Sequence, residues 1–348
     1  MSVGLKQDML KTIGKNAVAN DLAIDNAAQD SAESRRAKAL FGFKLRDNAF
    51  HLLTLAAAWT VLILLGGVIV SLVAGSLPAI RAFGFNFLLS EAWNPVTEKF
   101  GALAPIYGTV VTSIIAMAIA VPIGLGIAIF LTELCPYVLR RPIGIAIELL
   151  AGIPSIIYGI WGLFILAPFV QEHIQPGLIA FFSNVPVLSM LFAGPPYGIG
   201  MLTAGVILAI MVLPIMTSIS RDVFETVPAV LKESAFGIGC TTWEVVRFVV
   251  IPYTKVGIIG AVMLGLGRAL GETMAVTFVI GNAHRITASL LAPGTTISAT
   301  IANEFTEAVG DLYTSALIEL GLILFIITFF ILAISRYMLM RLHQQEGR

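Results

Sequence analysis

One arginine and one glutamate interrupt a long apolar segment of the chain. Arg268 and Glu272 are the only charged residues between Val256 and Gly281. In a helix, side chains four residues apart project from the same face, so these two would be neighbours. A charge at the centre of a membrane helix costs about 2.5–3.5 kcal/mol. Two such charges are therefore retained only when they pair with each other, face water or serve a function.

The chemistry of these two side chains suits an anion. The guanidinium of Arg268 offers donors in a fork that matches an oxyanion such as phosphate. Glu272 could then hold the arginine in place and keep the anion from being trapped. The alternative is a structural ion pair that fixes the register between helices. The spacing alone leaves both interpretations open.

The composition places this segment in a membrane protein. Of the 348 residues, 57% are hydrophobic and 12% are charged, whereas soluble domains have about 25% charged residues. That excludes a soluble enzyme, a basic nucleic-acid-binding protein and a disordered chain. The two cysteines, Cys135 and Cys240, indicate neither a metal cluster nor a disulfide scaffold. Because no GxxxxGK(S/T) loop and no Ser/His/Asp set occurs, we expect no catalytic residue, no metal site and no ATP binding in this chain.

The positions of the charges predict an all-α integral membrane protein with six membrane-spanning helices. The predicted spans lie near residues 50–76, 105–131, 142–168, 198–219, 256–281 and 312–336. Residues 174–193 are also apolar but contain Pro176, Asn184 and Pro186. We therefore expect an interfacial or partly re-entrant excursion there rather than a seventh span.

Two further acidic residues lie in predicted spans. Glu148 is expected near the cytoplasmic end of the third span, beside Arg140 and Arg141, where it would form an interfacial ion pair. Glu319, in the sixth span, indicates a polar contact between helices. Both are interpreted as structural residues.

The Lys and Arg residues predict the orientation, because they are enriched on the cytoplasmic side of membrane proteins. With the N-terminus inside, only Arg81, Lys99 and Arg285 fall in outer loops, Arg268 lies in a span, and all the others lie inside. Both termini are therefore predicted to be cytoplasmic. Residues 1–48 contain no apolar stretch long enough for a signal peptide. We expect a partly mobile cytoplasmic segment there, before a transmembrane domain over residues 49–348.

The loop over residues 221–252 is longer than a connector between the fourth and fifth spans needs to be. Its first part carries apolar residues at helical spacing beside charged ones, which predicts an amphipathic helix. Gly237 and Gly239 then indicate a turn, and a second helical run, Thr242 to Val250, is expected to end at Pro252. Such a hairpin is either a docking element for a partner protein or an amphipathic hairpin lying on lipid.

The spacing inside this loop resembles the EAA signature of ABC-importer permeases. The motif begins with Glu233-Ser234-Ala235, continues three residues later with Gly239, and ends nine residues after that with Val249-Val250-Ile251-Pro252. The family pattern reads E-A-A, three residues, G, nine residues, I-x-L-P, so the spacing matches and the substitutions are mild. The resemblance implies that the loop inserts into a groove on a cytoplasmic ATPase. The implied docking residues are Glu233, Ser234, Ala235, Gly239 and Pro252.

Longer segments resemble the PstC-type permeases of phosphate-specific ABC importers. These segments are residues 100–133, 148–164 and 265–282, and with the loop they cover most of residues 80–285. The resemblance implies a type I ABC-importer permease domain in the bacterial cytoplasmic (inner) membrane. It implies an anion pathway that includes Arg268 and Glu272. The implied partners are a second phosphate permease subunit, a dimer of nucleotide-binding ATPase subunits that hold ATP and Mg²⁺, an external phosphate-binding protein and membrane lipid.

Two other functions stay open on the sequence. A permease for another oxyanion, such as phosphonate, sulfate or molybdate, would use the same arginine chemistry. An ion-coupled secondary transporter would use Arg268 and Glu272 as its coupling site, but it does not explain the loop over residues 221–252, and no inverted repeat is visible. In each case we expect no enzymatic activity and no nucleic-acid partner for this chain.

Overall fold

The structure is a computed structural model that describes residues 46–346. In this part of the chain, the apolar runs between prolines, glycines and charged clusters fold into helices. Six helices in this part are long enough and apolar enough to cross a membrane. They are Arg46–Phe83, Leu103–Leu134, Ser155–Phe182, Met201–Glu225, Thr242–Leu270 and Asp311–Arg341. Within residues 46–346 no strand forms, and Asn94 and Lys99 make an isolated antiparallel bridge. The predicted all-α fold with six spans is confirmed, whereas the segment 1–48 lies almost entirely outside the described residues.

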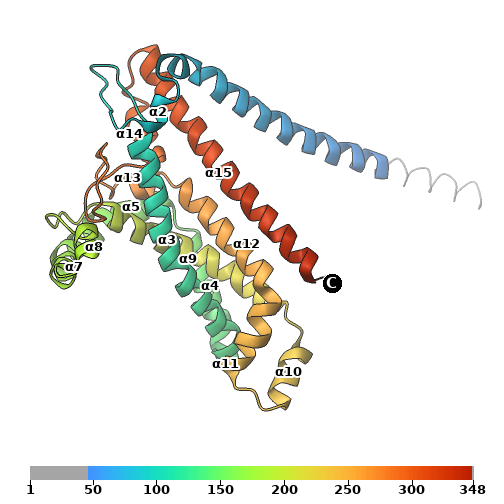
Figure 1. Cartoon of the computed structure of the whole chain (residues 1–348). Helices are drawn as coiled ribbons and strands as arrows, with labels where there is room; N and C mark the ends of the chain where they lie inside the picture. Colours follow the sequence, from blue (N-terminus) through green and yellow to red (C-terminus); the bar gives the residue numbers. More distant parts are fainter. Residues whose placement is uncertain (1–45, 347–348) are drawn as a thin grey trace, which may run out of the picture. The chain divides into compact units, whose positions relative to one another are not determined.

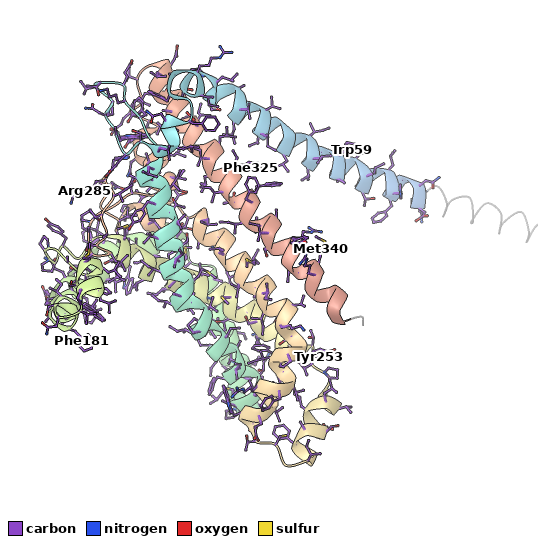
Figure 2. The ribbon with its side chains drawn as sticks, viewed as in Figure 1. Trp59, Phe181, Tyr253, Arg285, Phe325 and Met340 are labelled. Carbon is purple, nitrogen blue, oxygen red and sulfur yellow. The ribbon has the colours of Figure 1, made fainter. Side chains whose placement is uncertain are left out.

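The chain divides after residue 70 into two units, which are described separately. In the first unit, the described residues 46–70 form one continuous helix. Its apolar side chains are largely exposed, as Leu52 and Trp59 illustrate, and they project from it along its length (Figure 2). A helix that is apolar all round is suited to lipid or to contact with other membrane helices.

The second unit is a helical bundle built on two adjacent helices, α3 (Leu103–Ile129) and α9 (Met201–Glu225). Figure 1 shows α12 (Ile251–Leu270) beside them, and α15 (Asp311–Glu346) packs against α12. Small residues permit the close approach of membrane helices. A Cβ at Gly205 of α9, for example, would lie 2.5 Å from the side chain of Ile115 on α3.

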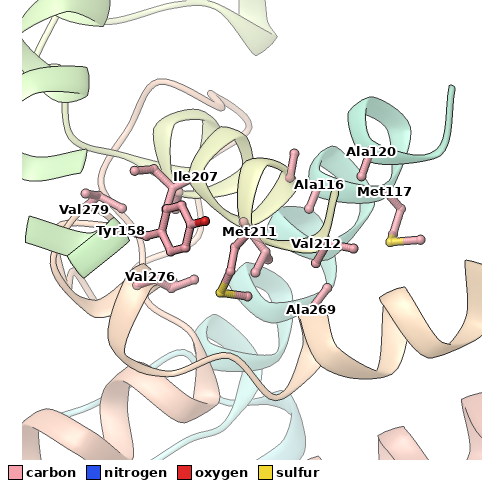
Figure 3. Close-up of a cluster of buried hydrophobic side chains, with 14 of the residues drawn as sticks. Ala116, Met117, Ala120, Tyr158, Ile207, Met211, Val212, Ala269, Val276 and Val279 are labelled. Carbon is pink, nitrogen blue, oxygen red and sulfur yellow. The ribbon is translucent and has the colours of Figure 1, made fainter. Parts of the chain in front are cut away.

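The largest apolar core lies between these helices (Figure 3). It joins α3 and α9 to the end of α12 and the segment that follows it, and its members are fully or almost fully buried. They include Ala116, Ala120, Ile207, Met211, Val212, Ala269, Val276 and Val279. Because the two central helices contribute mainly small and branched residues, their packing is tight and leaves a rigid frame for the loops.

Shorter helical elements connect the long membrane helices or are segments of them. They are α2 (Asn86–Leu89), α4 (Tyr137–Ala151), α5 (Ser155–Trp161), α6 (Ala167–Phe169), α7 (Gln175–Phe182), α8 (Pro186–Leu191), α10 (Ala229–Gly237), α11 (Thr242–Val245), α13 (Met274–Thr277) and α14 (Ile297–Glu304). In the second unit, α10 and α11 lie at one end of the bundle and α2 and α14 at the other (Figure 1).

Four π-helical turns interrupt the α-helical backbone of the described residues. They are η1 (Phe130–Leu134), η2 (Gly162–Leu166), η3 (Val170–Ile174) and η4 (Val246–Val250). Such turns widen a helix locally and are frequent at functional sites. The third and fifth candidate membrane helices continue through such turns, and the second ends in one.

The third candidate membrane helix differs from the predicted span 142–168. The helix α4 stops at Ala151, and a new helix begins at Ser155 and runs through η2, α6 and η3 to Phe182. The break has a local cause, because Pro154 lacks an N–H and disfavours helical backbone in the residue before it. The expected excursion over residues 174–193 is thus wrong in its first part, which completes this helix through α7.

The fifth candidate helix also differs from its predicted range, 256–281. The run of helix from Thr242 does not end at Pro252 but continues to Leu270. Proline clashes with the carbonyl four residues before it, and the π turn η4, directly before α12, widens the helix at that point. The other four helices cover their predicted ranges apart from a few residues at the ends.

Candidate functional site

The loop over residues 221–252 forms the helical hairpin that its sequence predicts. The first helix is α10, and Gly239 makes the turn with a φ of +93°, a conformation that favours glycine. A capping box then starts α11. The carboxylate of Glu244 accepts the N–H of Thr241 at 2.8 Å, and the hydroxyl oxygen of Thr241 accepts the N–H of Glu244 at 3.4 Å. We call residues 226–250 the docking hairpin, after the role that the sequence predicts for it.

An apolar cluster holds the docking hairpin against the bundle. Ala235, Val245 and Val250 of the hairpin are buried against Ala128 of α3 and Phe224 of α9. Both central helices therefore contribute to the contact that holds the hairpin. Ala235, one of the predicted docking residues, is therefore an anchor of the hairpin rather than a surface residue.

A buried ion pair reinforces this contact. The ammonium Nζ of Lys232, on α10, lies 2.5 Å from Oε1 of Glu133, in the π turn that ends the second candidate membrane helix. The side chains are 19% and 8% exposed, respectively. Sequence reasoning missed this pair, since no local spacing connects residues that are 99 positions apart. The sequence does contain one indication of the pair, because Lys232 and Glu133 carry opposite charges and both lie in segments predicted to be cytoplasmic.

The other side of the docking hairpin is exposed and apolar. Glu233 and Ser234 lie on this surface, and Pro252 is exposed at the start of α12. The exposed large apolar side chains of the hairpin are Val230, Leu231, Phe236, Ile238, Trp243 and Phe248. Amphipathic helices bind partner proteins by placing such a face in an apolar groove. The geometry therefore suits insertion of this surface into a partner.

The two predicted pathway residues do not form the expected pair. The helix α12 ends at Leu270, so Glu272 lies beyond the helix that carries Arg268. Gly271 is a weak helix former, and the Glu272 carboxylate accepts the N–H of Ala275 at 3.4 Å, at the start of α13. Both residues belong to the described chain, and no ion pair joins them there.

Arg268 is instead an exposed cation near the end of α12. Among residues 46–346 it has no hydrogen-bond or salt-bridge partner, so its five N–H donors are free. It is followed directly by Ala269 and Leu270, which are buried in the bundle. A guanidinium on a firmly packed helix end, with unused donors, can coordinate an oxyanion.

The other acidic residues of the predicted spans have different partners from those expected. Glu148 pairs with Arg221 at 2.9 Å, not with Arg140 or Arg141. Glu319 is 6% exposed, and its Oε2 has no hydrogen-bond partner within the described residues. No group of three or more His, Cys, Asp or Glu residues that could hold a metal ion occurs in that part of the chain.

A further polar cluster lies at the end of the bundle opposite the docking hairpin. The carboxylate of Glu304 accepts hydrogen bonds from the indole of Trp93 and the hydroxyl of Tyr313, each at 2.6 Å, and lies 2.7 Å from Nε2 of His284. Burial alone would raise the pKa of Glu304, but these hydrogen bonds and the charge of His284 hold it below the ordinary value. The cluster ties four segments together: the loop that carries Trp93, the loop that carries His284, α14 and α15.

The chain is similar to phosphate permeases over most of its length. It is 71% identical over 320 residues to a protein of Mesorhizobium japonicum named phosphate transport system permease protein PstC, covering 92% of this chain and 98% of that protein. The proteins of the same name from Pasteurella multocida and Haemophilus influenzae are 61% and 55% identical, over 83% and 87% of this chain and 90% and 96% of their own lengths.

The fold is also found in a solved transporter. An inward-facing structure of the MetNI methionine ABC transporter matches 68% of this chain and 94% of its own, with a TM-score of 0.50 and 16% sequence identity. That likeness supports the type I ABC-importer permease fold. No family model matches the chain. The identity and coverage of the sequence relatives nevertheless show that the chain belongs to the PstC family of phosphate transport system permease proteins.

Proposed function

We propose that the chain is a membrane-spanning permease subunit of an ATP-driven phosphate importer. The observation that carries this proposal is the 71% identity, over 92% of the chain, to a protein named as a phosphate transport system permease. The docking hairpin and the six apolar helices supply the features that such a subunit needs: a contact for an ATPase and a passage across the membrane.

The docking hairpin would connect ATP hydrolysis to the bundle. Its exposed apolar surface would enter a groove on a separate ATPase subunit, with Glu233, Ser234 and Gly239 at or beside the contact. Closure of an ATPase dimer would then press on the hairpin. The buried cluster and the Lys232–Glu133 ion pair would carry that movement to the ends of α3 and α9.

Arg268 would attract and transiently coordinate phosphate in a pathway shared with a second permease subunit. Its exposure and its unused donors support this role, since an arginine already neutralised by a carboxylate would bind an anion weakly. Glu272 would act beside the pathway through its position at the start of α13. It would limit how tightly the anion is held rather than clamp Arg268.

The remaining subunits and the orientation follow from the same proposal. The docking hairpin and both termini would face the cytoplasm of a bacterial cell, with the chain in the cytoplasmic membrane. An external phosphate-binding protein would deliver phosphate at the opposite side. ATP and Mg²⁺ would be bound by the ATPase dimer, and this chain would catalyse no reaction.

Uptake of labelled phosphate by membrane vesicles that carry this chain and its partners tests the proposal. We expect uptake that needs ATP on the side of the docking hairpin and persists in excess sulfate, molybdate or phosphonate. ATP-dependent uptake that another anion abolishes would change the substrate but keep the transporter class. Uptake driven by an ion gradient without ATP would contradict the role of the docking hairpin.

A further inference from the structure

A cavity of about 960 Å³ opens between α4 and the last turns of α9. Its lining includes three arginines and two glutamates, so the lining residues carry a net charge of +1: Arg140, Arg141, Arg221, Glu148 and Glu225. Neither the proposed docking of an ATPase nor the anion pathway uses this cavity. We propose that it binds the headgroup of a singly anionic phospholipid, such as phosphatidylglycerol, with the phosphate held by Arg140 and Arg141.

All three arginines have donors without a hydrogen-bond partner in the described residues, but Arg140 and Arg141 also have no carboxylate beside them there. Nη2 of Arg140 donates to the carbonyl of Thr132 at 2.6 Å, whereas its Nε is buried and has no hydrogen-bond partner among the described residues. A buried donor without an acceptor is costly, and a bound phosphate oxygen would remove that cost. Arg141 is exposed and pairs with no carboxylate in residues 46–346. Both arginines line the same cavity, and the guanidinium fork of an arginine can bind a phosphate in a bidentate manner.

Both carboxylates of the cavity form ion pairs with the third arginine, Arg221. Nη2 of Arg221 lies 2.9 Å from Glu148 and 3.1 Å from Asp222, and its Nε lies 4.0 Å from Glu225. Glu148 is also seven residues beyond Arg141 on α4, about 10 Å along the helix axis. The cavity therefore has a cationic end for a phosphate and a polar end where headgroup hydroxyls can donate to Glu148 and Glu225.

The surroundings of the cavity fit a lipid rather than a soluble anion. The contact of Arg140 with Thr132 places the cationic end next to the π turn that carries Glu133 and hence beside the docking hairpin. Val138 and Ile145, which also line the cavity, are exposed apolar residues, as are Tyr137 and Leu149 on the same helix. Acyl chains would cover this surface. Basic sites on the cytoplasmic side of membrane proteins attract anionic headgroups.

Native mass spectrometry of the assembled transporter, purified in detergent and titrated with phosphatidylglycerol, tests the site. We expect the Arg140→Gln/Arg141→Gln double variant to bind this lipid about 30-fold more weakly, because each arginine contributes a factor of about five. Arg141→Gln alone, which removes no hydrogen bond or ion pair of the described residues, should lose about five-fold. Arg336→Gln, which removes an exposed arginine from α15, is the matched control and should bind as the unmodified chain does.

Three results would overturn the proposal. The first is equal lipid binding by the Arg141 and Arg336 variants. The second is equally tight, arginine-dependent binding of phosphatidylethanolamine, because a zwitterionic lipid would not follow the net charge of the lining. The third is displacement of the lipid by millimolar inorganic phosphate, which would make the cavity a site for a soluble anion.

Discussion

The chain holds charged groups in two contrasting ways. At the docking hairpin, Lys232 and Glu133 are paired, largely buried and surrounded by an apolar cluster. Near the end of α12, Arg268 is exposed and unpaired within the described residues, although Glu272 follows four positions later. A contact proposed to transmit movement must stay closed, whereas a cation proposed to bind a passing anion must keep its donors free. The difference therefore agrees with the two proposed roles, coupling at the docking hairpin and anion binding at Arg268.

Removing one charge of the Lys232–Glu133 ion pair should have the largest effect on stability and assembly. Lys232→Met leaves the carboxylate of Glu133 buried without its partner and should destabilise the docking hairpin by about 3 kcal/mol. We expect loss of co-purification with the ATPase and a lower melting temperature of the isolated subunit. The Lys232→Met/Glu133→Leu double variant, which removes both charges, should recover most of the stability. A double variant as unstable as the single one would argue against the ion pair.

Removing the unpaired cation should act on transport alone. Arg268→Ala should reduce phosphate uptake about 100-fold, because charge-assisted hydrogen bonds to the anion are lost. Thermal stability and assembly should not change, since no contact of the described chain is broken. Leu264→Ala, one turn earlier on the exposed side of the same helix, is the control and should transport normally. Normal uptake by the Arg268 variant would contradict the pathway assignment.

The turn of the docking hairpin offers a smaller perturbation. A side chain at Gly239 would meet no atom within 4 Å, so the cost of Gly239→Val is backbone strain at a φ of +93°, about 1–2 kcal/mol. We expect weaker co-purification with the ATPase. Gly239→Asn should be tolerated better, because asparagine adopts positive φ more readily. Equal binding by the valine variant would show that the turn does not set the contact.

The Glu304 cluster is a second site of paired groups, at the other end of the bundle. Changing it should have a smaller effect on the protein than any of the changes above. Because the folded-state pKa of Glu304 is lowered, its contribution is present at neutral pH and is lost as the pH falls below the ordinary value of 4.5. Melting temperatures at pH 7 and pH 4 should therefore differ less in Glu304→Gln than in the unmodified chain. An unchanged difference would mean that other groups dominate the acid response.

The sequence predicts more of the fold than of the site. Long uncharged runs are enough to locate most of the membrane helices, and the glycine spacing in the loop is enough to predict the docking hairpin. The predicted range of the third helix is wrong because the positions of the charged residues give no sign of the break at Pro154. The Arg268–Glu272 pair failed for a similar reason, since helical spacing applies only while the helix continues past Gly271. The Lys232–Glu133 contact depends on tertiary packing, which local patterns do not report.

The π-helical turns have a consequence for changes in chain length. A π turn contains one more residue than the α-helical turn it replaces, so it is a position where a helix can lose a residue without being broken. Deleting one residue from η4 would therefore give a regular helix and leave the docking hairpin on nearly the same face, because the wider turn had absorbed the extra residue. A deletion within the regular part of α12 has no such turn to absorb it and would rotate the hairpin by about 100° around the helix axis. Lys232 would then no longer face Glu133, so the fit of the hairpin depends on where along the helix a residue is lost.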